Sequence, residues 1–287
     1  MSYECFDVSI KDDVAHIVLS RPERRNAMAA AFWDELPEIV EKIDQEAAAK
    51  VIVISSTGPH FTAGLDISAI GGGGGKGSSL SEEQAAMQHR IKGAKFYQNV
   101  KHMQNSFSIL ENCRIPVIAA VQGGAFGGGV DLLTACSMRF CTEDAFLTIF
   151  EIEVGMTADV GTFPRVLNHF PEGLVHELAY TGRRMFAQEA KTHGFFNEIY
   201  ADHDAMLDAV MKIARDIAQK PALAIWGCKH MIKYSRDHTT EDALDYIAIW
   251  NASNLQPEEM MEAMVARAEK RPGKFVDLPP IRNKTAI

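Results

Sequence analysis

The stretch IPVIAAVQGGAFGGGVDLLTAC, residues 115–136, decides the fold class of this 287-residue chain. It opens with a short apolar segment of the kind that forms a strand covered on both faces. Two glycine clusters follow, and then an apolar segment with helical character. Glycines between a strand and a helix let a ligand approach the backbone, and the first amides of the helix are free. This order indicates an α/β protein with a candidate site at the turn.

The glycine run itself leaves two interpretations open. No Gly-Lys-Ser/Thr sequence ends it, so it is not a P-loop. It also lacks G-x-G-x-x-G spacing in a first βαβ unit, which disfavours a dinucleotide site. The remaining alternatives are a backbone site for a polarised group and a purely structural role, in which the glycines let the helix pack tightly on the strand.

The segments before this stretch extend the α/β pattern. Residues 14–20 and 51–56 predict strands, and the amphipathic segment 29–48 between them predicts a helix. A strand, a helix and a strand in this order are expected to pair their strands in parallel. Residues 81–113 predict a long helix. The low-complexity segment 71–79 predicts a loop, which we interpret as a tolerated insertion rather than a lid.

After residue 170 the pattern is almost entirely helical. We therefore predict an α/β core over residues 1–200 and a helical C-terminal region over residues 201–287, which packs on the core or on a neighbouring subunit.

The composition limits which binding partners and which cellular compartment we expect for this protein. The net charge of −9 argues against a nucleic-acid partner, because that binding depends on clustered Lys and Arg. No apolar run reaches the ~18 residues of a membrane span. Neither the scattered cysteines nor the histidines show metal-ligand spacing, so no metal is expected. No targeting signal is visible, and the ending NKTAI is not S-K-L, which favours a bacterial-like cytoplasm.

A second loop, HFTAGLDI at residues 60–67, follows the other buried strand. It too has a small-residue turn before an apolar residue. Loops at the carboxyl ends of two parallel strands can bring two backbone amides together. Such a pair forms an oxyanion hole, which stabilises the charge that develops on a carbonyl oxygen.

These motifs, together with RPERRNAM at residues 21–28, resemble the enoyl-CoA hydratase/isomerase (crotonase) family over roughly residues 5–270. The resemblance implies a crotonase-like spiral core of ββα repeats with a helical C-terminal trimerisation region. It implies an acyl-CoA thioester as substrate, with coenzyme A part of the substrate and no separate cofactor. It also implies a homotrimer or a homohexamer built from two trimers.

The resemblance assigns site residues by position. The oxyanion-hole amides would belong to Leu65 and Gly128. The residues that contact substrate and coenzyme A would be Arg25, Ala27, Ala63, Gly64, Asp66, Ile67 and Gly129, with Lys274 and Phe275 reaching the coenzyme A, often that of a neighbouring subunit.

Three acids identify a subtype within this family. Hydratases carry Glu on the helix after the glycines, a second Glu twenty residues later and a small residue eight positions beyond. This chain has Asp131, Glu151 and Asp159 at those positions, so the first and third depart from the hydratase pattern. The trio resembles the Δ3,5-Δ2,4-dienoyl-CoA isomerases, as do ADVGTFPR at 158–165 and YSRDH at 234–238.

The chemistry of such an isomerisation needs two proton-transfer groups. One proton leaves and another is added four carbons away, a span that suits two carboxyl groups at opposite ends of an apolar slot. Desolvation and nearby acids raise carboxyl pKa values, so one acid can stay protonated while another is ionised. We expect Asp159 and Glu151 to transfer the protons, with Asp159 as the base at C2, and Asp131 to support them.

Each acid also has a structural alternative. Asp131 suits the first turn of any helix, Glu151 fits a solvated strand, and Asp159 could cap the helix that follows, although Thr162 fits that cap better. Two other functions are weighed for the whole chain. One is an enoyl-CoA hydratase, which would add water to 2-enoyl-CoA, and the other is a non-enzymatic oligomeric scaffold.

Overall fold

The computed structural model describes residues 3–66 and 81–281, so Ile67 and the glycine-rich segment 71–79 lie outside the described residues. Its framework is a six-stranded sheet with the strand order β1-β2-β3-β4-β6-β9. β1 and β2 pair antiparallel, and the other neighbours pair in parallel, as predicted for the strands of the core. The strands span β1 Phe6–Lys11, β2 Val14–Leu19, β3 Val51–Ser56, β4 Val117–Val121, β6 Met138–Thr142 and β9 Glu198–Tyr200.

Both faces of the central strands β3 and β4 are buried, which explains their apolar runs. Successive side chains of a strand point to opposite faces. In β3, Ile52 and Ile54 accordingly join the larger core cluster, while Val51 and Val53 join the smaller cluster on the other face.

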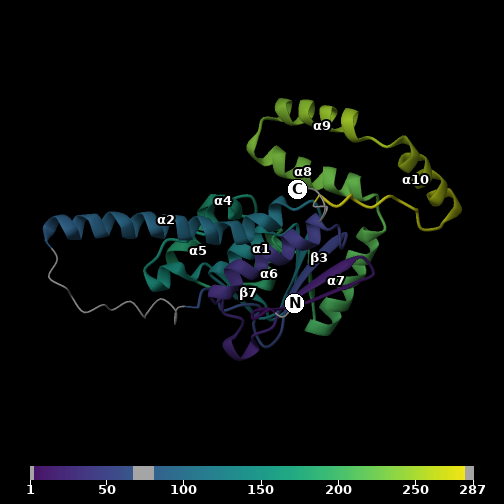
Figure 1. Ribbon diagram of the computed structural model, residues 1–287. Helices are drawn as coiled ribbons and strands as arrows, with labels where there is room; N and C mark the ends of the chain where they lie inside the picture. The colour runs from purple at the N-terminus through teal and green to yellow at the C-terminus, as the bar shows by residue number, and fades with distance from the viewer. Residues whose placement is uncertain (1–2, 67–80, 282–287) are drawn as a thin grey trace.

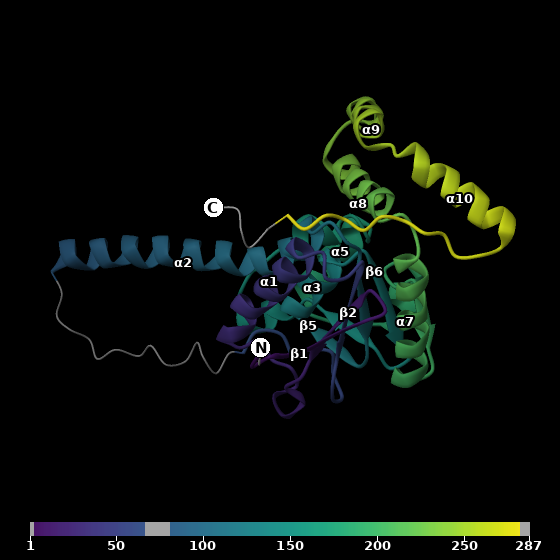
Figure 2. The ribbon, with the colours of Figure 1, turned by 45° about the vertical axis from the view of Figure 1, so that its right-hand side comes forward.

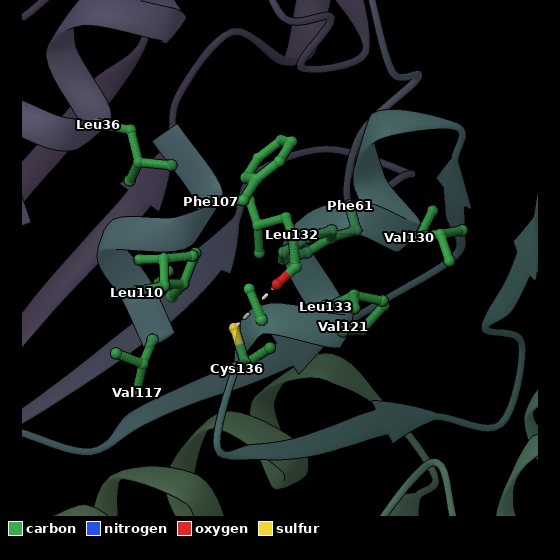
Figure 3. Packing of buried hydrophobic residues seen from close by; sticks show 14 of the residues in the cluster. Leu36, Phe61, Phe107, Leu110, Val117, Val121, Val130, Leu132, Leu133 and Cys136 are labelled. Atoms are coloured by element: carbon green, nitrogen blue, oxygen red, sulfur yellow. Dashed lines mark hydrogen bonds between the residues drawn. The ribbon is translucent and has the colours of Figure 1, made fainter. Parts of the chain in front are cut away.

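Helices form a layer on each side of the sheet (Figures 1 and 2). Figure 3 shows the larger cluster, in which Phe107 and Leu110 of α2 lie near Leu132 and Leu133 of α3. On the other face α7 supplies apolar side chains such as Val210. These helices span α1 Ala30–Gln45, α2 Glu82–Asn112, α3 Gly128–Ala135 and α7 His203–Ala218. The predicted helices 29–48 and 81–113 are therefore confirmed with slightly shorter ends.

A small second sheet lies beside the glycine turn. Its order is β5-β7-β8, and β5 begins three residues after β4 ends. The chain then runs through a short 3-10 helix and several short helices before it rejoins the main sheet at β9. These elements span β5 Gly124–Phe126, β7 Phe146–Thr148, η3 Phe150–Val154, α4 Thr162–Val166, α5 Glu172–Thr181, β8 Met185–Phe186 and α6 Ala187–Thr192; a further 3-10 turn, η1, spans Pro22–Arg24.

The last helices extend away from the core, as both ribbon views show. They span α8 Ala222–Asp237, α9 Thr240–Asn254 and α10 Pro257–Glu269. α8 is held to the core by Lys229, whose ammonium group donates to the carbonyls of Leu110 and Ile115, each at 2.7 Å. Trp226 and Trp250 join α8 to α9, with ring centroids 5.1 Å apart. Across the described residues, none of the helices is both long and apolar enough to cross a membrane.

Candidate active site

Two loops at the carboxyl ends of β3 and β4 lie against each other. The Thr62 amide donates to the Gly124 carbonyl at 3.2 Å, and the Phe126 amide donates to the Thr62 carbonyl at 3.1 Å. β3 and β4 are parallel neighbours, so their carboxyl ends share one edge of the sheet. The fold thus brings HFTAGLDI and the glycine stretch together.

The amides of Leu65 and Gly128 face this junction without hydrogen-bond partners in the described part of the chain. Gly64 makes the close approach possible. It has a φ of +78°, and a Cβ there would lie 2.6 Å from the Phe126 carbonyl oxygen and 3.7 Å from the Gly128 nitrogen. Two unpaired amides, one of them at the start of a helix, can together hold a negatively charged oxygen.

The structural interpretation of the glycines also holds. A Cβ on Gly128 would lie 2.9 Å from the Met28 sulfur, and one on Gly129 would lie 2.6 Å from Cγ2 of Thr62. The glycine run therefore permits tight packing as well as leaving an amide free.

Asn26 fixes the first loop from inside the protein. Its side-chain amide donates to the carbonyls of Thr57 (2.7 Å) and His60 (3.1 Å), and its side-chain oxygen accepts from the Arg21 amide (2.9 Å). Its backbone carbonyl accepts from the Thr62 hydroxyl at 2.7 Å. Sequence reasoning quoted this residue within RPERRNAM but missed its role. Its φ of +53° is a conformation that Asn tolerates better than most residues, so an Asn in the polar turn after the first predicted strand is the sequence signal that could have pointed to it.

Asp131 lies in the first turn of α3 and is completely buried. Neither carboxylate oxygen completes a hydrogen bond with a described residue. Burial first, and then the nearby Glu151 carboxylate, raise the pKa of Asp131 to about 7, although Thr162 and Arg165 oppose this rise. A buried acid without hydrogen bonds needs a functional explanation, because it costs stability.

Glu151 lies in η3, and its carboxylate reaches back toward the glycine turn. A Cβ on Gly127 would lie 3.0 Å from Oε1 of Glu151, so glycine at this position makes room for the acid. Burial raises the pKa of Glu151, and the Asp159 carboxylate adds to this. Its other oxygen, Oε2, is buried without a hydrogen bond to a described residue.

Asp159 is half-buried in the irregular segment between η3 and α4. Burial raises the pKa of its carboxyl group. The electrostatic couplings join Asp131 to Glu151 and Glu151 to Asp159, so the three acids, which are far apart in sequence, form one cluster. Mutual repulsion in such a cluster favours a state in which at least one acid holds a proton.

The structure gives little support to the purely structural roles that were considered for the three acids. Asp131 does lie in a first helical turn, but it is wholly buried rather than placed at a solvated terminus. Glu151 lies in a 3-10 helix rather than a strand. The residue that caps α4 is Gly161, with a φ of +134° and no side-chain hydrogen bond, so neither Asp159 nor Thr162 is the cap. The expectation for Thr162 was wrong because the helix starts one residue earlier and buries its hydroxyl.

The residues expected to contact coenzyme A divide into two groups. Most lie on the two loops or beside them: Arg25, Ala27, Ala63, Gly64, Asp66 and Gly129. The Ala63 amide donates to the Arg25 carbonyl at 2.9 Å, and Asp66 forms an ion pair with Arg24 at 3.3 Å. Ile67 lies outside the described residues.

Lys274 and Phe275 are the second group, and within one chain they lie away from this cluster. The Lys274 amide donates to Glu262 of α10, and the tail then returns to the core, where Asp277 pairs with Lys50 at 2.7 Å. Lys50 precedes the amino end of β3, whereas the site lies at its carboxyl end.

Known proteins resemble this chain over almost its whole length. The model of the enoyl-CoA hydratase/isomerase family matches residues 9–278. The chain belongs to this family. It is 40% identical over 280 residues to the protein of Mus musculus named mitochondrial Delta(3,5)-Delta(2,4)-dienoyl-CoA isomerase, covering 96% of this chain and 83% of that protein. It is 34% identical over 281 residues to the peroxisomal protein of that name in Arabidopsis thaliana, covering 96% and 99%.

Solved structures of the family share the fold. The enoyl-CoA hydratase of Bacillus anthracis superposes with a TM-score of 0.82 and 26% identity, over 95% of this chain and 99% of that one. The names of the most similar relatives support an isomerase of the crotonase superfamily and do not favour the hydratase alternative.

Proposed function

We propose that this enoyl-CoA hydratase/isomerase family member converts 3,5-dienoyl-CoA to 2,4-dienoyl-CoA in fatty-acid β-oxidation. The observation that carries the proposal is the cluster of Asp131, Glu151 and Asp159 beside two free amides. The relatives named dienoyl-CoA isomerases at 34–40% identity support the same reaction.

The reaction moves one proton off the acyl chain and one onto it. Asp159, ionised, removes a proton from C2, and the electrons spread over the two double bonds and the thioester oxygen. The amides of Leu65 and Gly128 stabilise the negative charge on that oxygen. Glu151, protonated, then gives a proton to C6, which leaves double bonds at C2–C3 and C4–C5. The proton lost and the proton gained balance, and the two acids exchange a proton with each other or with solvent before the next turnover.

The remaining residues have supporting roles in this proposal. Asp131, whose pKa the Glu151 carboxylate helps to raise, supports the site electrostatically. The coenzyme A moiety would contact the backbone and side chains of Arg25, Ala27, Ala63, Gly64, Asp66, Ile67 and Gly129. We further propose that Lys274 and Phe275 reach a coenzyme A bound to a neighbouring subunit, because they lie away from the site of their own chain.

A homotrimer, or a hexamer of two trimers, is part of the proposal. It is supported by the apolar side chains that α9 and α10 expose on the extended part of the molecule, which include Leu244, Met261 and Met264. Exposed apolar surface of this kind is typical of an unoccupied interface.

An absorbance assay tests the reaction. With 3,5-dienoyl-CoA as substrate, the near-ultraviolet absorbance of the conjugated 2,4-dienoyl thioester should rise. D159N and E151Q should each lower kcat by about 100-fold or more, because each removes a proton-transfer group. The matched control is E153Q, an exposed glutamate of the same 3-10 helix, which should retain wild-type rates.

Three outcomes would contradict the proposal. A D159N enzyme with a near wild-type rate would remove Asp159 from the mechanism. Loss of 2-enoyl-CoA absorbance by hydration, with no product from 3,5-dienoyl-CoA, would make the chain a hydratase. A protein inactive in both assays would be a scaffold.

A further inference from the structure

The irregular segment that carries Asp159 raises the question of what holds this acid in place. The residues between η3 and α4 form no regular structure, and several side chains before Asp159 are exposed, among them Val154 and Met156. A cavity of about 370 Å³ lies beside the segment and includes Asp159 and Gly161 in its wall. Ala158 and Val160, which flank Asp159, are buried in the larger core cluster, but Asp159 itself borders the cavity, so packing alone does not fix the position of the acid.

One side chain from another element forms a hydrogen bond with the segment. Nε2 of Gln104, on α2, donates a hydrogen bond to the backbone carbonyl of Asp159 at 2.7 Å. Between residues 157 and 160, this is the one hydrogen bond to a different element that the described structure contains. The side-chain oxygen of Gln104 in turn accepts from Lys101 at 3.0 Å, which orients the amide group.

The same face of α2 also holds the helix that follows Asp159. Ser108 accepts from Arg165 of α4 at 3.0 Å, and Glu111 pairs with Arg165 at 3.0 Å. Residues 104, 108 and 111 are spaced by four and three, so they share one side of the helix. Glu111 also pairs with Arg236 of YSRDH at 2.6 Å, so ADVGTFPR and YSRDH meet on α2.

α2 is a firm support at this level. Phe107 and Leu110 are completely buried in the larger core cluster, and the Ser106 hydroxyl donates to the Trp33 carbonyl of α1 at 2.8 Å. Residues anchored on such a helix hold a partner more precisely than residues on a loop do.

We propose that Gln104 is a positioning residue, which sets the position of the Asp159 carboxylate relative to Glu151 by holding the Asp159 backbone. The inference rests on the proposed isomerase function and deepens it. Because Gln104 acts on a carbonyl, its contribution depends on a hydrogen-bond donor at this position and not on its amide oxygen. A misplacement of about 1 Å at a reacting group can cost about 100-fold in rate.

Four proteins test the proposal with 3,5-dienoyl-CoA as substrate: wild type, Q104M, Q104K and N105M. Q104M keeps the length of the side chain but removes the donor, and should lower kcat by about 10- to 100-fold with KM changed by less than about 3-fold. Q104K restores a donor and should recover at least part of the loss. N105M alters the next residue of α2, which is exposed, and should behave as wild type.

Hydrogen–deuterium exchange provides a readout that does not depend on the reaction. Q104M should speed exchange of the amides in residues 156–161 and leave the core strands unchanged. If wild type isomerises the substrate, an unchanged kcat in Q104M, or a loss that Q104K does not reduce, overturns the proposal. If wild type is inactive, the proposed function fails and exchange alone decides: unchanged exchange at 156–161 then overturns the positioning role.

Discussion

Asp131 illustrates, at the scale of a single residue, how a site can oppose the stability of the fold that contains it. Its carboxyl group is completely buried, has no hydrogen bond to a described residue and has a pKa raised to about 7. In the unfolded chain the same group has a pKa near 3.8. Ionisation of this acid is therefore less favourable in the folded protein than in the unfolded chain. As a result, the group lowers the free energy of unfolding as pH rises.

Replacement of Asp131 by asparagine should stabilise the protein in a pH-dependent way. Between about pH 4 and pH 7 the folded state binds more protons at this site than the unfolded state, so wild-type stability falls as pH rises through that window. D131N removes this effect. Its free energy of unfolding should exceed that of wild type by about 2–4 kcal/mol at pH 8, and the two proteins should differ little below about pH 4. Urea unfolding at several pH values measures it. The matched control is D7N, on an exposed aspartate of β1, and equal pH dependence in D131N and wild type would contradict the burial argument.

The pH dependence of the activity should reflect the other two acids. Catalysis needs Asp159 ionised and Glu151 protonated, and burial raises the pKa of both. The rate should therefore fall as pH drops through the raised pKa of Asp159 and as pH rises through that of Glu151, giving a bell-shaped profile of kcat. The profile of E153Q should coincide with that of wild type, whereas E151Q should lose the alkaline limb from its residual activity. A flat profile between pH 4 and pH 9 would count against this pairing of roles.

At the scale of elements, the site depends on loops that are held to one another as much as on the strands that carry them. The turn after β2 is joined to the loop after β3 through Asn26, and that loop is joined to β5 through Thr62. α2 holds the segment between η3 and α4. Each acid and each free amide thus lies at the junction of two elements.

Asn26→Ala should loosen the loop that carries Leu65. The substitution leaves the Thr57 carbonyl and the Arg21 amide without their partner inside the protein, and the His60 carbonyl keeps only the Ser56 hydroxyl at 3.3 Å, which should together cost about 2–4 kcal/mol. Thermal and urea unfolding measure the loss, and kcat should fall because the oxyanion amide is displaced. N99A removes an exposed asparagine of α2 and should change neither quantity. A cost below about 0.5 kcal/mol would mean that Asn26 does not organise the loop.

At the scale of the whole molecule, α9 and α10 extend from the core (Figures 1 and 2). Several of their apolar side chains are exposed. The chain after α10 returns to the core, where the Ile281 amide donates to the Gln45 carbonyl at 2.9 Å. The extended helices are therefore anchored at both ends and can present a defined surface.

A charge placed on that surface should break the proposed assembly. L244E and M264E each put a carboxylate on a side chain that is more than 60% exposed in the single chain, and burial of that charge at an interface would be unfavourable. Light scattering after size-exclusion chromatography should show a trimer or hexamer for wild type and smaller species for both variants. I10E, on β1 at the edge of the sheet, is the matched control. A monomeric wild-type protein would refute the assembly.

The sequence by itself determined the elements and their order, because these depend on short-range patterns. The strand at residues 51–56, the helix 29–48 and the strand, glycine turn and helix of residues 115–136 follow from local patterns, and the structure confirms them. The family and the positions of the three acids follow from spacing in the same way.

Only the tertiary structure decided how those residues act on one another. The burial of Asp131, the 3-10 helix under Glu151 and the cap of α4 at Gly161 could not be read from local patterns. The support of Asp159 by Gln104 joins residues 55 positions apart. Burial and hydrogen bonding between distant segments depend on the packing of the whole chain, and it is this packing that sets the charges and positions of the acids.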